Sequence, residues 1–109
     1  MSHLSLGEFE ELVLLAVCGL TEDAYAVSIQ QRIEQRADRA VTMGAVYAAL
    51  DRLEKKGFVT SYLGEVTQER GGRRKRFYDI TGVGRAAVTA MRQARERMWE
   101  GLDFYPSPG

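Results

Sequence analysis

The sequence is poor in the residues on which catalysis and metal binding usually depend. Its 109 residues include one histidine, one cysteine and one tryptophan. His3 stands at the N-terminus, and Cys18 has no second cysteine with which to form an intramolecular disulfide. No pair of acidic residues stands in an apolar setting of the kind that moves a pKa towards neutrality. We therefore expect no enzyme activity, no metal site and no cofactor.

Long apolar runs are also absent. No stretch approaches the ~18 apolar residues that a membrane-spanning helix needs, and the N-terminus lacks the apolar core of a signal peptide. Cys18 lies in an apolar segment, as expected of a small buried side chain in a reducing compartment. The sequence thus predicts a cytoplasmic protein without a membrane partner. Its length and its 45% apolar composition predict one modest core.

The chain has no net charge, but its charged residues are unevenly distributed along the sequence. Fifteen Lys and Arg residues balance fifteen Asp and Glu residues. Residues 1–30 carry five acidic residues and no Lys or Arg, whereas residues 52–76 carry eight Lys or Arg against three Glu. An anionic partner such as nucleic acid would therefore meet the middle of the chain.

This basic segment has the pattern of a helix followed by a β-hairpin. Val46, Leu50 and Leu53 share one helical stripe after an N-cap at Thr42, and Gly57 ends the helix. Strands are expected at residues 58–63 and 73–80, on either side of a polar loop rich in Gly and Arg. Together these elements predict a helix-turn-helix with a basic wing.

Three more helices are expected around this segment. The first begins near Leu6, where Ser5 and Glu8 fit a capping box. The second covers about residues 24–36, with Ala26, Ile29 and Ile33 turned inward. The last follows an N-cap at Thr81 and carries apolar residues at steps of three and four, close to a coiled-coil seam; they are Val83, Ala87, Met91, Ala94 and Met98.

Three motifs resemble the PadR family of bacterial transcriptional regulators: GAVYAALDRLEKKGFV, the wing GGRRKRFYDIT, and TGVGR at the start of the last helix. The resemblance covers about residues 4–92. It implies a mainly α fold with a small β-hairpin, made of a winged helix-turn-helix DNA-binding domain at residues 1–80 and a C-terminal dimerisation helix and tail at residues 81–109. It also implies a homodimer that binds double-stranded DNA, commonly as a repressor on a pseudo-palindromic operator, and in some members a small aromatic effector.

The candidate DNA-binding residues lie on the helix after Thr42 and on the wing. Small side chains on the outer face of that helix would let it approach a major groove, although no long hydrogen-bond donor precedes Arg52. Strand alternation sends Arg74 and Arg76 to one face and Arg73 and Lys75 to the other. The alternative is a winged-helix module that contacts protein only. The candidates are Thr42, Gly44, Ala45, Tyr47, Ala48, Arg52, Arg70, Arg73, Arg74, Lys75 and Arg76.

A second subunit is expected to cover the first and last helices. The first helix is apolar on nearly all sides, which suggests a covering partner in so small a protein. Trp99 lies among other large apolar residues and belongs either to a dimer core or to an effector pocket with Met98 and Leu102. The expected interface residues are Phe9, Leu12, Val13, Ala87, Met91, Ala94 and Met98.

Overall fold

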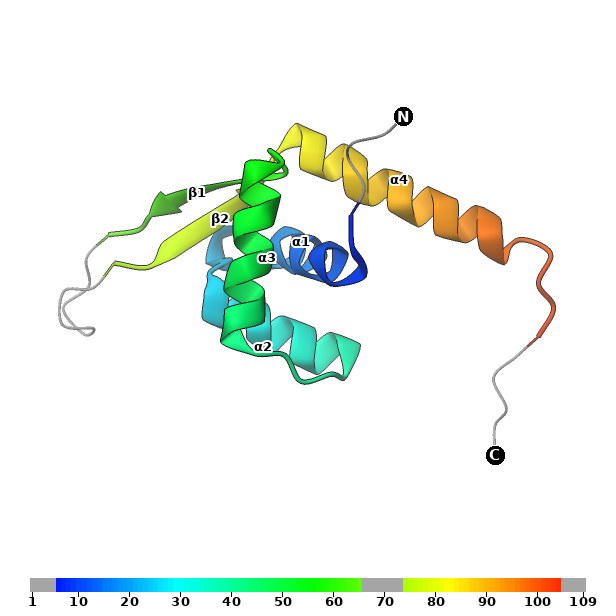
Figure 1. The fold of residues 1–109 in the computed structure, drawn as a ribbon, viewed down its shortest axis with the longest axis horizontal. Coiled ribbons are helices and arrows are strands. Elements are labelled where there is room, and N and C mark those ends of the chain that lie inside the picture. The colour runs from blue at the N-terminus through cyan, green and yellow to red at the C-terminus, as the bar shows by residue number, and fades with distance from the viewer. Residues whose placement is uncertain (1–5, 66–73, 105–109) are drawn as a thin grey trace.

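The computed structural model describes residues 6–65 and 74–104. Three helices pack together, a two-stranded hairpin projects from them, and a fourth helix crosses the other side and extends away (Figure 1). This is the mainly α fold with one small hairpin that the sequence predicts. In chain order the elements are α1 (Glu8–Leu20), a 3₁₀ turn (Thr21–Asp23), α2 (Ala26–Ala37), α3 (Met43–Lys55), β1 (Val59–Leu63), β2 (Arg76–Ile80) and α4 (Gly82–Trp99).

The first two helices begin two residues later than the patterns suggest. At α1 the Gly7 N–H donates to Glu10 Oε1 at 3.0 Å, so the capping carboxylate is that of Glu10 and not of Glu8. Ser5 lies outside the described residues. At α2 the backbone of Ala24 and Tyr25 is extended and pairs with β2, which delays the helix to Ala26. Tertiary pairing therefore overrides local helix propensity at this end.

Helix α3 follows its sequence pattern closely. Thr42 Oγ1 accepts a hydrogen bond from the Ala45 N–H at 3.1 Å, as an N-cap side chain does. Val46, Leu50 and Leu53 are all buried in the core between α1 and α2. Gly57 has φ +80°, a left-handed conformation that favours glycine, and turns the chain out of the helix towards β1.

Both edges of β2 form backbone hydrogen bonds. The strands pair antiparallel with Val59 opposite Ile80 and Leu63 opposite Arg76. On its other edge β2 is covered by the segment before α2, because the Tyr78 N–H donates to the Ala24 carbonyl oxygen at 2.9 Å. The base of the wing is thus held by its own strand pairing on one edge and by the segment before α2 on the other.

Phe58 fills the junction where α3, β1 and α4 meet. Among the described residues its side chain is the largest that is fully buried, and its N–H donates to the Leu53 carbonyl oxygen at 2.9 Å. Its own carbonyl oxygen accepts from the Thr81 N–H at 3.0 Å, while Thr81 Oγ1 accepts from the Gly84 N–H at 3.0 Å and caps α4. The first turn of α4 therefore lies directly against the start of β1. No described helix is long and apolar enough to cross a membrane.

Gly84 is required for this close approach. A Cβ added there would lie 2.3 Å from the Phe58 carbonyl oxygen, whereas one added at Gly82 would meet nothing within 4 Å. We expect Gly84→Ala to destabilise the fold by about 1–3 kcal/mol because the backbone must shift. Gly82→Ala, in the same helical turn, should leave stability unchanged or slightly raised. Thermal unfolding followed by circular dichroism measures both; equal midpoints for the two variants would contradict the tight contact.

Candidate nucleic-acid interface

The outer face of α3 is open to solvent. Thr42, Gly44, Ala45 and Ala48 are exposed, and Tyr47 keeps 55% of its surface accessible. The opposite face carries the buried core residues of the helix. A helix with one buried stripe and an exposed face of small side chains can approach another macromolecule at backbone distance.

The described wing cations, at the start of β2 and just before it, project from both faces of the hairpin. Arg76 donates to Ser61 Oγ at 3.0 Å on the face that turns towards α3. Lys75 places its ammonium 4.1 Å from the centre of the Tyr25 ring on the other face, a cation–π contact. Arg74 donates from Nε to the Gly64 carbonyl oxygen at 2.7 Å at the end of the described hairpin. Arg70 and Arg73 lie outside the described residues.

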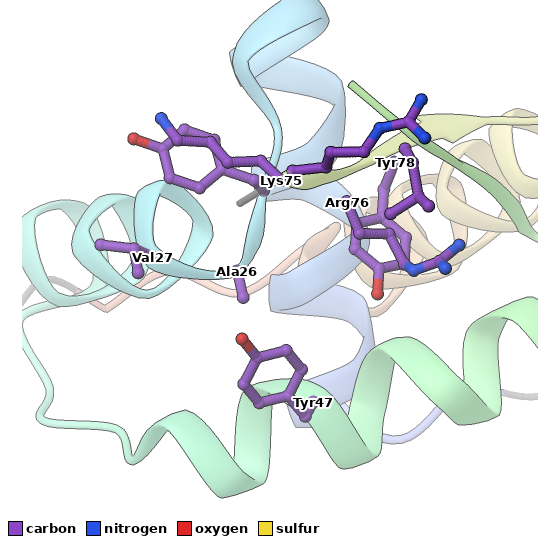
Figure 2. Close-up of a pocket in the computed structure, with 9 residues that line it drawn as sticks. Ala26, Val27, Tyr47, Lys75, Arg76 and Tyr78 are labelled. Carbon is purple, nitrogen blue, oxygen red and sulfur yellow. The ribbon is translucent and has the colours of Figure 1, made fainter. Parts of the chain in front are cut away.

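A hollow of about 630 Å³ separates α3 from the wing. Figure 2 shows Tyr47 reaching into it from α3, with Ala26 and Val27 at the start of α2 and the side chains of β2 facing them. The hollow therefore brings Tyr47 together with the three described wing cations. Its lining is Tyr25, Ala26, Val27, Tyr47, Leu63, Arg74, Lys75, Arg76 and Tyr78.

Tyr78 belongs to this site, although its sequence pattern singles it out only as a strand residue. Its side chain is 6% exposed and lines the hollow. Burial raises the pKa of Tyr78, and the carboxylate of Glu54 adds to the rise while Arg76 opposes it. The phenol is therefore a neutral hydrogen-bond donor at neutral pH.

Residues 14–90 match the PadR-like family of transcriptional regulators. The chain belongs to this family. A PadR-like transcription factor from Bacteroides fragilis superposes with a TM-score of 0.70 at 25% identity, covering 86% of this chain and 85% of that one. A PadR family transcription regulator from Clostridium difficile R20291 superposes with a TM-score of 0.71 at 27% identity. The superposition covers 84% of this chain and 91% of that one.

A further relative comes from Lysinibacillus sphaericus. This uncharacterized protein is 29% identical over 106 residues, which cover 95% of this chain and 93% of the relative. The PadR-like family is regulatory rather than enzymatic.

In this PadR-like chain Arg52 is held by an ion pair. Glu10, on α1, is 6% exposed and accepts from Arg52 Nε at 2.7 Å and from Lys56 Nζ at 2.8 Å. Burial of Glu10 raises its pKa, but the hydrogen bonds from Lys56, the Gly7 N–H and Arg52 outweigh it and hold the pKa at about 2. Arg52 therefore fastens the end of α3 to α1, a role that its place in the sequence does not reveal.

The neighbouring Glu11 forms the corresponding contact with α4. It is 8% exposed and pairs with Arg95 at 2.5 Å. Neither glutamate was singled out from the sequence, since two acids in the first turn of a helix ordinarily face solvent. Their only signal is their position between apolar neighbours, in the run Phe9-Glu10-Glu11-Leu12-Val13.

The expected interface residues of this PadR-like chain separate into two groups. Val13 has no exposed surface and Ala87 is buried, so both belong to the protomer core. Phe9, Leu12 and Met91 are partly buried against that core, and Ala94 is half-buried. Met98 is 77% exposed, on the part of α4 that extends beyond the core. In the protomer, Met98 is thus far more accessible than Val13 or Ala87.

Of the three expected effector-pocket residues, Trp99 alone lines the hollow between α1 and α4. Trp99 borders a hollow of about 420 Å³ between α1 and α4, with Leu15, Val88 and Arg95 among its neighbours. Met98 and Leu102 are exposed and lie outside that lining. The Trp99 ring instead lies 5.6 Å from the ring of Phe104, centre to centre.

The Glu10 ion pair predicts a stability change in acid. Because its folded-state pKa lies below the ordinary 4.5, charged Glu10 stabilises the fold above about pH 4.5, and this contribution is lost as the pH falls towards about 2. Glu10→Gln should therefore lower the free energy of unfolding by about 1–3 kcal/mol at pH 7. Between about pH 4.5 and 2, this variant should lose less of its remaining stability than the unmodified chain does. Urea unfolding at a series of pH values measures both effects.

A matched control for this experiment lies on the same helix. Glu8 is exposed and pairs with Arg39 at 3.3 Å near the surface, where ion pairs contribute little. Glu8→Gln should therefore keep the acid sensitivity of the unmodified chain. If the unfolding free energy of Glu10→Gln falls with pH in parallel with that of Glu8→Gln, Glu10 does not form a strong ion pair.

Proposed function

We propose that this regulator is a homodimer that binds double-stranded DNA through α3 and the wing, and that it represses transcription from a pseudo-palindromic operator. One observation carries the proposal: Tyr47, on the open face of α3, lines the same hollow as the cations Arg74, Lys75 and Arg76. A duplex laid against that surface would meet small side chains at its groove and positive charge at its backbone.

The residues divide between two tasks in this proposal. Gly44, Ala45 and Ala48 let α3 enter a major groove closely, and the alanine methyl groups suit contact with thymine methyl groups. Thr42 and Tyr47 would hold backbone phosphates, as would the wing cations. With Arg52 engaged by Glu10, base recognition would depend on few side chains and on DNA shape.

The proposed dimer is formed by apolar side chains that the protomer leaves uncovered. Large exposed apolar residues occur on α1 and along the end of α4 and the segment after it; they are Leu15, Met98, Trp99, Leu102 and Phe104. Such a patch favours contact with a second copy. Two-fold symmetry would place the two α3 helices in half-sites about one DNA turn, ~34 Å, apart. A small aromatic effector would bind at the hollow beside Trp99, where it would touch α1 and α4 together.

The wing cations should set the salt dependence of DNA binding. Each phosphate neutralised by a cation adds roughly −0.9 to the slope of log affinity against log salt. If two cations from each subunit contact phosphates, the dimer has four such contacts, and removing them should make the slope less steep by about 3.6. We expect Arg74→Ala with Arg76→Ala to flatten the slope by up to that amount and to weaken all sequences almost equally. Fluorescence anisotropy with a labelled duplex from the protein's own promoter, over a salt series, measures this.

The control removes the same charge elsewhere. Arg85 and Arg92 are exposed on α4, and alanine at both should leave the slope unchanged. If the unmodified chain binds no duplex, including its own promoter, the chain is a protein-contact module instead. If it binds but both double variants give the original slope, the wing does not touch the DNA backbone.

Dimer formation is tested at Met98. Because this side chain is exposed in the protomer, Met98→Glu should leave the protomer folded but place like charges in the proposed interface. We expect monomers by light scattering, and at least tenfold weaker operator binding. Gln93→Glu, also exposed on α4, is the control and should remain dimeric. A dimer of unchanged mass for Met98→Glu would remove this end of α4 from the interface.

A further inference from the structure

A groove of about 220 Å³ lies between α1 and α2. Most of its lining is apolar, and one of these side chains, Leu15, keeps 45% of its surface accessible. Leu15 also lines the hollow beside Trp99, so the groove adjoins the apolar patch of the proposed dimer. The residues that line the groove are Leu12, Leu15, Ala16, Arg32, Ile33, Arg36 and Ala37.

Two cations of α2 give this groove its charge. Arg32 and Arg36 are one helical turn apart, and neither forms an ion pair or a side-chain hydrogen bond with another described residue. The guanidinium of Arg32 lies against α1 at Gly19, where an added Cβ would come within 2.6 Å of Arg32 Cζ. None of the described residues that line the groove is acidic. An apolar segment that carries carboxylates would therefore complement the groove.

The end of α4 and the residues after it have this composition. Trp99, Leu102 and Phe104 are each more than half exposed. Glu100 and Asp103 lie between them in the sequence, and their exposed carboxylates have no partner among the described residues. Residues 99–104, which we call the α4 tail, contain no Lys or Arg. The tail thus matches the groove in both apolar character and charge.

The α4 tail has a defined shape within the protomer. The chain turns at Gly101, which has φ +78°, and the Leu102 N–H donates to the Trp99 carbonyl oxygen at 3.0 Å. The rings of Trp99 and Phe104 are in contact across this turn. Because the tail is already folded back on itself, less conformational entropy is lost when it binds.

We propose that the α4 tail of one copy docks in the groove between α1 and α2 of a second copy. Leu102 and Phe104 supply the apolar contact, and Glu100 and Asp103 pair with the two arginines of the groove. Figure 1 shows that α4 carries its tail away from the packed helices, which favours a second copy as the partner. This inference rests on the proposed homodimer and adds to it a contact that two-fold symmetry forms twice.

Charge reversal on either side should weaken the dimer. Arg32→Glu with Arg36→Glu makes both groove and tail negative, whereas Glu100→Arg with Asp103→Arg makes both positive. Each double variant should dimerise at least tenfold more weakly than the unmodified chain, because like charges then meet at both contacts. Light scattering over a concentration series measures this. Lys55→Glu with Arg74→Glu is the control, since it reverses two exposed cations outside the groove and should leave the dimer intact.

Mixing the two double variants tests whether the contact joins two copies. In a heterodimer the negative tail meets the positive groove and the positive tail meets the negative groove. The mixture should therefore recover dimers, which native mass spectrometry should identify as heterodimers. If the mixture stays monomeric, or if either variant alone dimerises like the unmodified chain, the tail does not dock in the partner's groove.

Two checks accompany this experiment. Circular dichroism tests whether each variant is folded; if the variant at Arg32 and Arg36 is not, Arg36→Glu alone replaces it, because Arg36 is exposed. If the unmodified chain is itself monomeric, the proposed homodimer fails and the tail contact fails with it. A dimeric unmodified chain with dimeric reversal variants overturns the tail contact alone.

Discussion

Burial of Phe58 fixes the relative positions of the parts that matter for function. The residue follows the glycine that ends α3 and precedes β1, and its carbonyl oxygen accepts from the residue that caps α4. A full aromatic side chain in a core this small contributes on the order of 2–3 kcal/mol. This anchor joins the end of α3, the start of β1 and the cap of α4 at one point.

Local patterns were sufficient for the elements that carry their own signals. The stripe of Val46, Leu50 and Leu53, the Thr42 cap and the glycine at position 57 predict α3 with its observed limits, because each acts within a few residues. The starts of α1, α2 and β2 were less well predicted. At α2 the reason is pairing of Ala24 and Tyr25 with a strand about fifty residues later, which no local pattern contains.

The candidate site shows the same division. Tyr47 and the wing cations could be named from the sequence, since exposure and charge follow from helical and strand periodicity. The engagement of Arg52 by Glu10 could not, because the two residues are 42 positions apart and meet only in the folded chain. Tyr78 alternates onto the same face as Arg76, but only the packing of β2 against the helices shows that its side chain is buried and lines the hollow. The helical pattern places Val13 at an interface, but the fold covers it completely within the protomer.

The two buried glutamates of α1 make that helix a shared support. Consecutive residues on an α-helix point about 100° apart, so Glu10 and Glu11 leave α1 in different directions, one towards the end of α3 and the other towards α4. The spacing between these two anchors is therefore set by a single peptide unit. An insertion or deletion of one residue beside them would rotate one carboxylate away from its cation, whereas the loops before and after α2 could change length without that effect. Length variation among descendants of this chain should thus be least tolerated in α1.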